Sequence, residues 1–150
     1  MADPPRSKTQ RRADTRARLE HETDCWVASA DADGNAYLVP LSFYWDGEAV
    51  VMATPLEAPT AVNLIRAGRA RVGIGPTRDL VLVDGTVEAI ARDDVADLGD
   101  RHAHATGFDP RTYETVYVYL RIRPTAIRAW REANELPGRL LMHDGVWLDD

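Results

Sequence analysis

The chain has 150 residues, 45% of them hydrophobic, and a formal net charge of −6. This length suits one soluble domain with a substantial core. No apolar run approaches the ~18 residues that a membrane-spanning helix needs, and residues 1–16 contain no apolar stretch of the kind found in secretory signals. We therefore expect a cytoplasmic protein without membrane contacts.

Cysteine usage and charge placement narrow the chemistry further. Cys25 is the only cysteine, so the chain cannot form an internal disulfide or a thiolate cluster for a metal. The basic side chains near the start of the chain have no aromatic residues between them, and no nucleic-acid-binding module is recognisable. We therefore expect no nucleic-acid partner.

The first 23 residues differ in composition from the rest of the chain. Residues 1 to about 10 are rich in proline and charge, which predicts poor order, whereas Arg11 to Thr23 can form a short helix with few apolar residues. This pattern predicts a flexible basic lead and a short helix over residues 1–23. A single folded domain is expected over residues 24–150.

Three strand-like runs follow, joined by two Asp-Gly turns at residues 33–34 and 46–47. The runs are CWVASA from Cys25, AYLVPLSFYW and AVVMAT, and Asp-Gly between apolar runs is a strong hairpin signal. We expect an antiparallel meander whose middle strand, apolar on both sides, is buried on both faces. Pro40 cannot donate a ladder hydrogen bond, so it should lie at an edge or a bulge.

The next element is a helix with two possible starts. Thr54 resembles an N-cap, but a helix that began there would place Pro59 where its ring clashes with a preceding carbonyl. We prefer a turn first and then a helix over Pro59–Ala67, ended by Gly68. The residues that would share its apolar face are Ala61, Leu64 and Ile65.

Two further strands are predicted over Arg69–Gly75 and Leu80–Ile90, with Gly85 at a bulge. A helix is predicted over Asp93–Ala105. Alternation then predicts a half-buried strand over Thr115–Arg123. Its inward residues are expected to be Val116, Val118, Leu120 and Ile122.

After this strand, Ala126 to Trp130 can continue it beyond Pro124, and the Asp-Gly pair at residues 144–145 predicts a small terminal hairpin that carries Trp147.

Few side chains suggest catalysis or metal binding by themselves. His102 and His104 are two residues apart, so on a helix they point to different sides and make a poor metal pair. The glycine-containing run GIGPTRD is not followed by a helix, as a dinucleotide site or a P-loop requires. We expect no metal site and can nominate no catalytic acid, base or nucleophile.

Several short patterns nevertheless agree with one known family. They are Asp33-Gly34, the run LVPLSFYWDG, Thr54 at the end of the third strand, the pair Asn63-Leu64 and the run VDGTVE. Between Cys25 and about Ile90, and more weakly to Arg123, the chain resembles the pyridoxamine 5'-phosphate oxidase-like flavin reductases and deazaflavin-dependent reductases. The combination is fairly specific, although each piece alone is weak.

This resemblance implies a mainly β, α+β fold: a split antiparallel β-barrel of about six strands over residues 24–150, with short helices. It also implies a homodimer that holds FMN or a deazaflavin coenzyme in a groove at the dimer interface. Thr54 and Thr60 would contact the phosphate, near a helix N-terminus whose amides favour anions. The other implied cofactor contacts are the backbone of Val39, Pro40 and Leu41, together with Asn63 and Arg78.

The chain departs from the family pattern at several cofactor positions. Pro59 and Thr60 stand where arginine and lysine usually contact the phosphate, so charge-assisted hydrogen bonds are lost there. Leu80 replaces a frequent glutamine or arginine, which leaves Arg78 as the neighbouring donor. Leu38 and Phe43 stand where a true pyridoxine phosphate oxidase has basic residues. An apolar groove would favour a small, flat, hydrophobic substrate.

Two functional hypotheses follow, with a third in reserve. The first is a flavin- or deazaflavin-dependent oxidoreductase that transfers a hydride to such a small-molecule substrate, with catalysis coming from cofactor placement. The alternative is a non-catalytic split-barrel dimer that binds a flavin, haem or another flat ligand. A purely structural or regulatory dimer is the third hypothesis.

Overall fold

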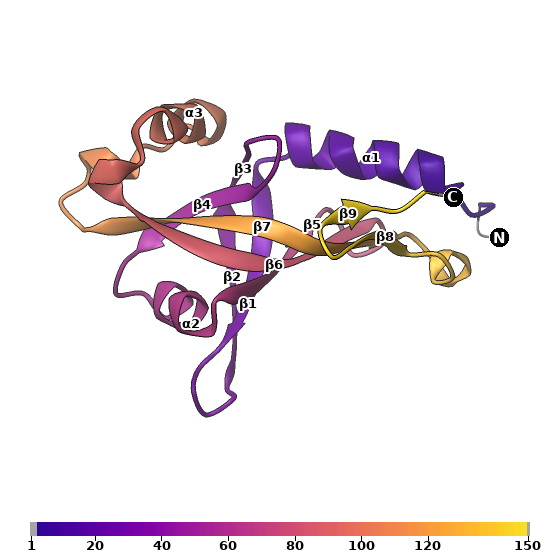
Figure 1. Ribbon diagram of the computed structural model, residues 1–150, viewed down its shortest axis with the longest axis horizontal. Coiled ribbons are helices and arrows are strands. Elements are labelled where there is room, and N and C mark those ends of the chain that lie inside the picture. Colours follow the sequence, from indigo (N-terminus) through magenta and orange to yellow (C-terminus); the bar gives the residue numbers. More distant parts are fainter. Residues whose placement is uncertain (1–2, 150) are drawn as a thin grey trace.

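The computed structural model describes residues 3–149 and shows a single curled antiparallel sheet with three helices (Figure 1). Six strands are long: β1 (Asp24–Ala30), β2 (Ala36–Ser42), β4 (Val50–Pro55), β5 (Arg69–Ile74), β6 (Leu80–Ala91) and β7 (Tyr117–Trp130). Three are short: β3 (Tyr44–Trp45), β8 (Leu140–His143) and β9 (Val146–Trp147). The mainly β, α+β class is therefore confirmed.

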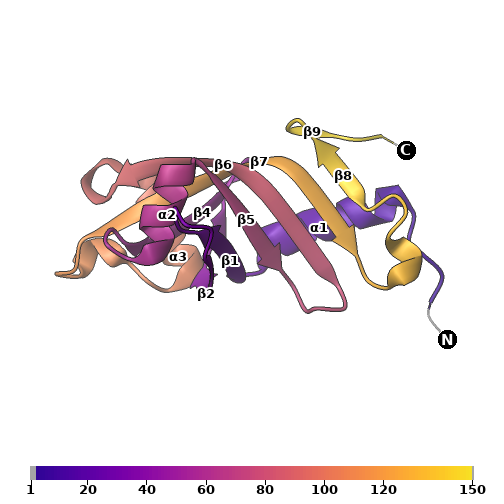
Figure 2. The ribbon, with the colours of Figure 1, turned by 90° about the horizontal axis from the view of Figure 1, so that it is seen from below.

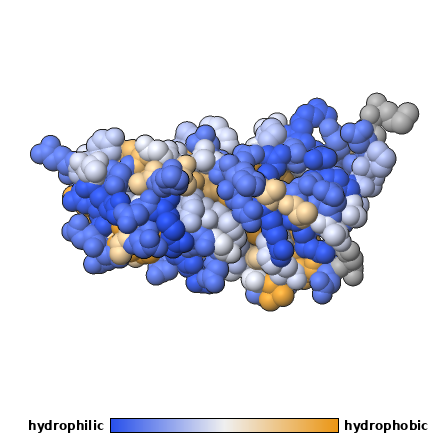
Figure 3. All heavy atoms as spheres, turned by 90° about the horizontal axis from the view of Figure 1, so that it is seen from above, coloured by the Kyte–Doolittle hydropathy of each residue, from blue (hydrophilic) through white to orange (hydrophobic). Residues whose placement is uncertain are grey.

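The helices are α1 (Lys8–His21), α2 (Pro59–Ala67) and α3 (Ala96–Thr106), and 3-10 turns lie at Arg92–Asp94, Pro110–Thr112 and Ala133–Glu135. Among residues 3–149, no helix has the length and apolar character needed to cross a membrane. Helices α1 and α3 lie on the same side of the molecule, and Figure 3 shows that this side is mostly hydrophilic.

The strand order corrects the predicted meander. The order across the sheet is β2-β1-β5-β6-β7-β4-β3, with β8 added to β7 and β9 to β8. The β1–β2 and β3–β4 hairpins therefore lie at opposite ends of the sheet, because the chain turns inward at Phe43. That side chain is fully buried, and its N–H donates to the Thr23 carbonyl over 2.8 Å.

The sheet curls until its two ends meet. Strands β2 and β4 come into contact, yet they share no ladder of backbone hydrogen bonds. The barrel is consequently split between these two strands, and the long antiparallel pair β6–β7 crosses it from end to end (Figure 2).

Strand β2 is not buried on both faces, as the sequence suggested. Val39 and Leu41 pack against the main core, but Leu38 is 61% exposed on the outer face and Pro40 is also exposed. β2 pairs with β1 only and is therefore an edge strand of the sheet. The expected edge position of Pro40 is thereby confirmed.

Strand β7 contributes to two separate cores. Val118, Leu120 and Ile122 face the main core as predicted, whereas Val116 precedes the strand and is 52% exposed. Tyr119, predicted to face outward, is fully buried in a second cluster with Val51, Ala53 and Val95. Half-buried Leu98 of α3 packs on that cluster, so both faces of this part of the sheet are covered.

Helix α2 has the predicted bounds, and Gly68 ends it in the left-handed conformation with φ of 73°. Ala61 and Leu64 are buried as expected, but Ile65 is 42% exposed. Polar Thr60 and Asn63 are buried in its place. The prediction from apolar residues was wrong at Ile65, because the buried face of α2 includes the polar residues Thr60 and Asn63.

Two other predictions concern local backbone geometry. The ladder between β6 and β7 shifts register between Asp84 and Gly85, which confirms the bulge. A Cβ at Gly85 would collide with the Arg123 carbonyl oxygen, so the close approach of the strands requires glycine. Helix α3 begins at Ala96 and not at Asp93, because the chain first forms the Arg92–Asp94 turn.

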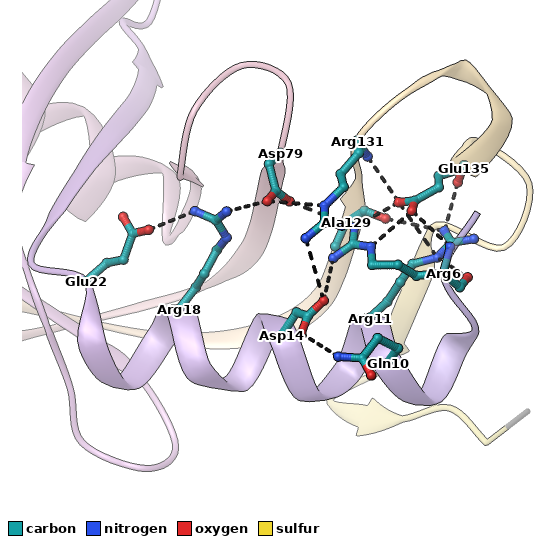
Figure 4. Close-up of polar contacts among 10 residues, drawn as sticks. All are labelled: Arg6, Gln10, Arg11, Asp14, Arg18, Glu22, Asp79, Ala129, Arg131 and Glu135. Carbon is teal, nitrogen blue, oxygen red and sulfur yellow. Dashed lines mark hydrogen bonds and ion pairs between the residues drawn. The ribbon is translucent and has the colours of Figure 1, made fainter. Parts of the chain in front are cut away.

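Helix α1 is docked by a network of arginines and carboxylates (Figure 4). The helix starts at Lys8, three residues before the predicted start, because the Ser7 hydroxyl accepts the Gln10 N–H over 3.1 Å and caps it. Arg6 Nη2 donates to Glu135 Oε2 over 2.8 Å, and Arg6 Nη1 donates to Asp14 over 2.9 Å.

The same network reaches two other parts of the barrel. Arg11 donates to the Glu135 backbone carbonyl over 2.8 Å, and Arg18 pairs with Asp79 of the β5–β6 turn over 2.6 Å. Arg6, which lies in the stretch predicted to be poorly ordered, is therefore bound to the barrel. The predicted flexibility of residues 1 and 2 lies outside the described residues.

We expect Glu135→Gln to lower the free energy of unfolding by about 3 kcal/mol at pH 7, because it leaves buried guanidinium groups without their counter-charge. Hydrogen bonds from Arg6 lower the pKa of Glu135 from its ordinary 4.5 to about 2. The carboxylate therefore stabilises the fold above pH 4.5, and this contribution is lost as the pH falls through 2.

Urea unfolding between pH 7 and pH 2 tests this expectation. The matched control is Glu132→Gln, because Glu132 makes an exposed pair with Arg78. Such a pair contributes little to stability. Equal effects of the two substitutions at pH 7 would contradict the role given to Glu135.

Candidate functional site

The candidate site lies where β2, β4 and the start of α2 come together. Helix α2 contacts β1, β2 and β4. Thr54 is near the end of β4 and Thr60 is in the first turn of α2, and both are almost fully buried, at 4% and 2% exposed. The structure therefore places these two predicted phosphate contacts on elements that meet at the split of the barrel.

The first turn of α2 retains donor capacity for an anion. Its N-cap residue is Ala58, which offers no side-chain acceptor to the first amides of the helix. Within the described chain, no hydrogen bond involves the hydroxyl of Thr54 or Thr60. Amides and hydroxyls of this kind can bind a phosphate through neutral hydrogen bonds.

Asn63 holds α2 against the sheet. Its Nδ2 donates to the Ser29 hydroxyl of β1 over 3.1 Å, and the side chain is only 6% exposed. The amide therefore has a structural partner that fixes the helix relative to β1. Asn63 can position the site through this contact.

Strand β2 forms one side of the split. Val39 and Leu41 direct their side chains to the core, and Pro40 lies on the outer face. Because β2 has only one ladder partner, its second backbone edge is available for a ligand. This edge is the part of the structure that can face a flat ring, as the resemblance implies for residues 39–41.

Arg78 is separated from the other predicted site residues. It lies in the β5–β6 turn, its side chain is 80% exposed, and its Nη2 pairs with Glu132 over 2.7 Å. The adjacent Leu80 pairs with Trp130 at the end of β7, whereas Thr54 pairs with Val118 near its start. Those β7 positions are roughly 40 Å apart along the strand, at about 3.3 Å per residue.

The start of α2 also lacks a cation. The only basic residue of α2 is Arg66, in its last turn, and the first turn holds no acidic residue either. The first turn of α2 therefore supplies a hydroxyl and amides to the site, without a basic side chain of its own. This arrangement can orient a phosphate and a flat ring, but it binds charge less strongly than guanidinium groups do.

A buried polar pair lies elsewhere, beneath α3. His102 is 1% exposed, its ring is edge-on to that of Tyr119 at 5.4 Å, and neither ring nitrogen has a partner within residues 3–149. Burial lowers the pKa of His102 from 6.5 to about 4, so the ring is neutral at pH 7. The Tyr119 hydroxyl is also without a partner there.

No sequence pattern indicated this pair. The only signal was the alternation that carries Tyr119, and it pointed to solvent. His104 is exposed, so the two histidines do face different sides of α3. Within the described residues, no group of three or more histidine, cysteine or carboxylate side chains could hold a metal ion.

We expect His102→Leu to leave the free energy of unfolding at pH 7.5 within about 1 kcal/mol of wild type or above it, because it removes unpartnered buried nitrogens. In the wild type the depressed pKa gives stability above pH 6.5 that is lost as the pH falls through 4. The free energy of unfolding of His102→Leu, measured by urea unfolding, should therefore fall less than that of the wild type between pH 6.5 and pH 4. An unchanged decline, or the same change in the exposed His104→Leu control, would refute this expectation.

Comparison with known proteins agrees with the fold. A family model described as "Pyridoxamine 5'-phosphate oxidase" matches residues 12–131. No curated protein matches the chain.

Several solved structures are similar in fold. An F420 reductase is 19% identical, with a TM-score of 0.62 over 74% of this chain and 93% of its own. PhzG from Burkholderia lata 383, solved with tetrahydrophenazine-1-carboxylic acid, is 16% identical, with a TM-score of 0.58 over 86% and 80%. A haem-binding protein from Mycobacterium smegmatis is 18% identical, with a TM-score of 0.67 over 97% and 60%. At these identities the similarity concerns the fold alone.

Proposed function

Because the chain belongs to the pyridoxamine 5'-phosphate oxidase family, we propose that it is a flavin- or deazaflavin-dependent oxidoreductase acting on a small, flat, apolar substrate. The family includes oxidoreductases of this kind, and the similarity to an F420 reductase supports a deazaflavin as much as FMN. The cofactor would lie at the split between β2 and β4.

The hydroxyls of Thr54 and Thr60, two largely buried residues at the end of β4 and in the uncapped first turn of α2, support this proposal most directly. They offer neutral donors suited to the phosphate of either cofactor, and Asn63 fixes the helix that carries them. The free edge of β2 would orient the ring against Val39 and Leu41.

When bound, the cofactor would supply the hydride chemistry. The residues of this chain would bind the phosphate, align the ring and keep water from an apolar groove. We assign no side chain of this chain to proton transfer, so rate enhancement would come from positioning.

A second copy of the chain would complete the groove. On the outer face of the sheet, Trp26 is 52% exposed and Leu38 is 61% exposed, and Pro40 lies beside Trp26 in the β1–β2 ladder. Gly73 of β5 lies opposite Trp26 on its other side. An uncovered apolar face of this kind favours a homodimer in which β2 of each chain is shielded.

We expect Trp26→Glu to convert a dimer into a monomer, because it places a charge in the centre of this face. Val146→Glu is the matched control, since Val146 is 64% exposed in the terminal hairpin, away from β1. Light scattering after size exclusion gives both masses. A monomeric wild type, or a dimeric Trp26→Glu variant, would rule out the proposed interface.

Thr60→Lys tests the cofactor position. The substitution restores a cation at the start of α2, so the dissociation constant for FMN should fall about tenfold, which corresponds to about 1.4 kcal/mol of added binding free energy. Val62→Lys adds the same charge on the exposed side of the same helix and should change the affinity far less. Unchanged or weaker binding in Thr60→Lys would count against the proposed phosphate position.

A non-catalytic binding role is the second candidate. The absence of a cation from the first turn of α2, and the similarity to a haem-binding protein, favour a protein that holds a flavin, haem or another flat ligand without turnover. Hydride transfer to a quinone by the cofactor-loaded protein would separate the two functions, because only the oxidoreductase would reduce the substrate over repeated cycles.

A further inference from the structure

An open groove of about 900 Å³ lies over the start of β5, beside the last turn of α2. The charged residues that line it include Arg66 of α2 and Arg69 and Arg71 of β5. Small side chains such as Ala28 and Ala30 of β1 line it too. A molecule that enters the groove therefore meets three arginine side chains and small apolar side chains.

The acidic residues of the groove are already engaged by other groups. Asp84 accepts hydrogen bonds from Arg71 Nε over 2.6 Å and from Arg128 Nη1 over 3.1 Å. Asp31 accepts the backbone N–H groups of Asp33 and Asn35 in the β1–β2 turn, over 3.0 and 2.9 Å. Both carboxylates therefore already accept hydrogen bonds from groups of the protein.

The arginines, in contrast, retain donors. Arg66 uses Nη2 on the Ala30 carbonyl, and Arg71 uses Nε and Nη2 on Asp84. Within residues 3–149, no hydrogen bond or ion pair involves the Arg69 guanidinium. The lining arginines outnumber the lining carboxylates by one, on a chain whose net charge is −6. The groove is a local excess of positive charge on an acidic protein.

We propose that this groove binds a phosphorylated small molecule, with Arg69 as its principal anion contact. Guanidinium groups match the oxygens of a phosphate, and the exposed Thr86, which pairs with Arg69 in the β5–β6 ladder, adds a hydroxyl donor on the neighbouring strand. Three guanidinium groups and a hydroxyl offer more hydrogen-bond donors than a ligand with one carboxylate could use. A phosphate has more acceptor oxygens, so this set of donors favours a phosphorylated ligand. The small side chains of Ala28 and Ala30 leave room for the part of the ligand that carries no phosphate.

The groove is distinct from the candidate cofactor site. It lies at the last turn of α2, whereas Thr60 lies in the first turn, and none of the predicted cofactor contacts lines it. Binding in the groove requires neither a flavin nor a hydride acceptor. The groove does lie on the outer face that the proposed dimer would partly cover, because Ala28 pairs with Leu38 of β2 and with Arg71 of β5.

Calorimetric titration of the purified full-length chain with inorganic pyrophosphate at low ionic strength tests this proposal. We expect saturable binding to the wild type and at least tenfold weaker binding to Arg69→Gln. The matched control Arg139→Gln removes an equal charge from an exposed site on the segment before β8 and should bind like the wild type. Circular dichroism would verify that both variants are folded.

The proposal is overturned if pyrophosphate shows no saturable binding, or if both substitutions weaken binding equally, since the latter would mean attraction by overall charge. An FMN titration of the same variants distinguishes the two sites. Unchanged FMN binding in Arg69→Gln supports a separate groove, whereas parallel loss of FMN and pyrophosphate binding would overturn the separation.

Discussion

The pairing of β7 with three other strands is the constraint on which the rest of the structure depends. β7 pairs with β6 along twelve residues of β6, with β4 near its start and with β8 near its end. A bulge at Gly85 lets β6 follow it without a steric clash. One strand therefore carries the main core on one face and the cluster around Tyr119 on the other.

This topology creates the candidate site as a consequence. With β4 bound to β7 and β2 bound to β1, the two ends of the sheet meet without pairing and leave backbone donors and acceptors at the split. Helix α2 follows β4 directly, so its first turn is placed at that point with Thr60 buried. The site holds hydrogen-bond donors in fixed positions, but the first turn of α2 has no charged side chain. The identity of the ligand therefore cannot be inferred from charge.

Local signals in the sequence predicted local structure well. The Asp-Gly turns, the helix Pro59–Ala67 with Gly68 at its end and the bulge at Gly85 depend on backbone preferences of a few residues. The strand order, the exposed Leu38 and the separation of Arg78 from Thr54 depend on contacts between distant segments, which periodicity does not encode. Of the cofactor contacts that the resemblance implied, those on β2, β4 and α2 lie on elements that come together, whereas Arg78 lies apart from them.

The most direct test of the account is titration of the wild-type protein with FMN and, separately, with a deazaflavin coenzyme, followed by fluorescence and confirmed by calorimetry. The account predicts micromolar binding of one of them, with one cofactor per chain. Binding of neither would contradict it, because the hydroxyls and amides at the split would then be insufficient to hold a cofactor without a basic side chain in the first turn of α2.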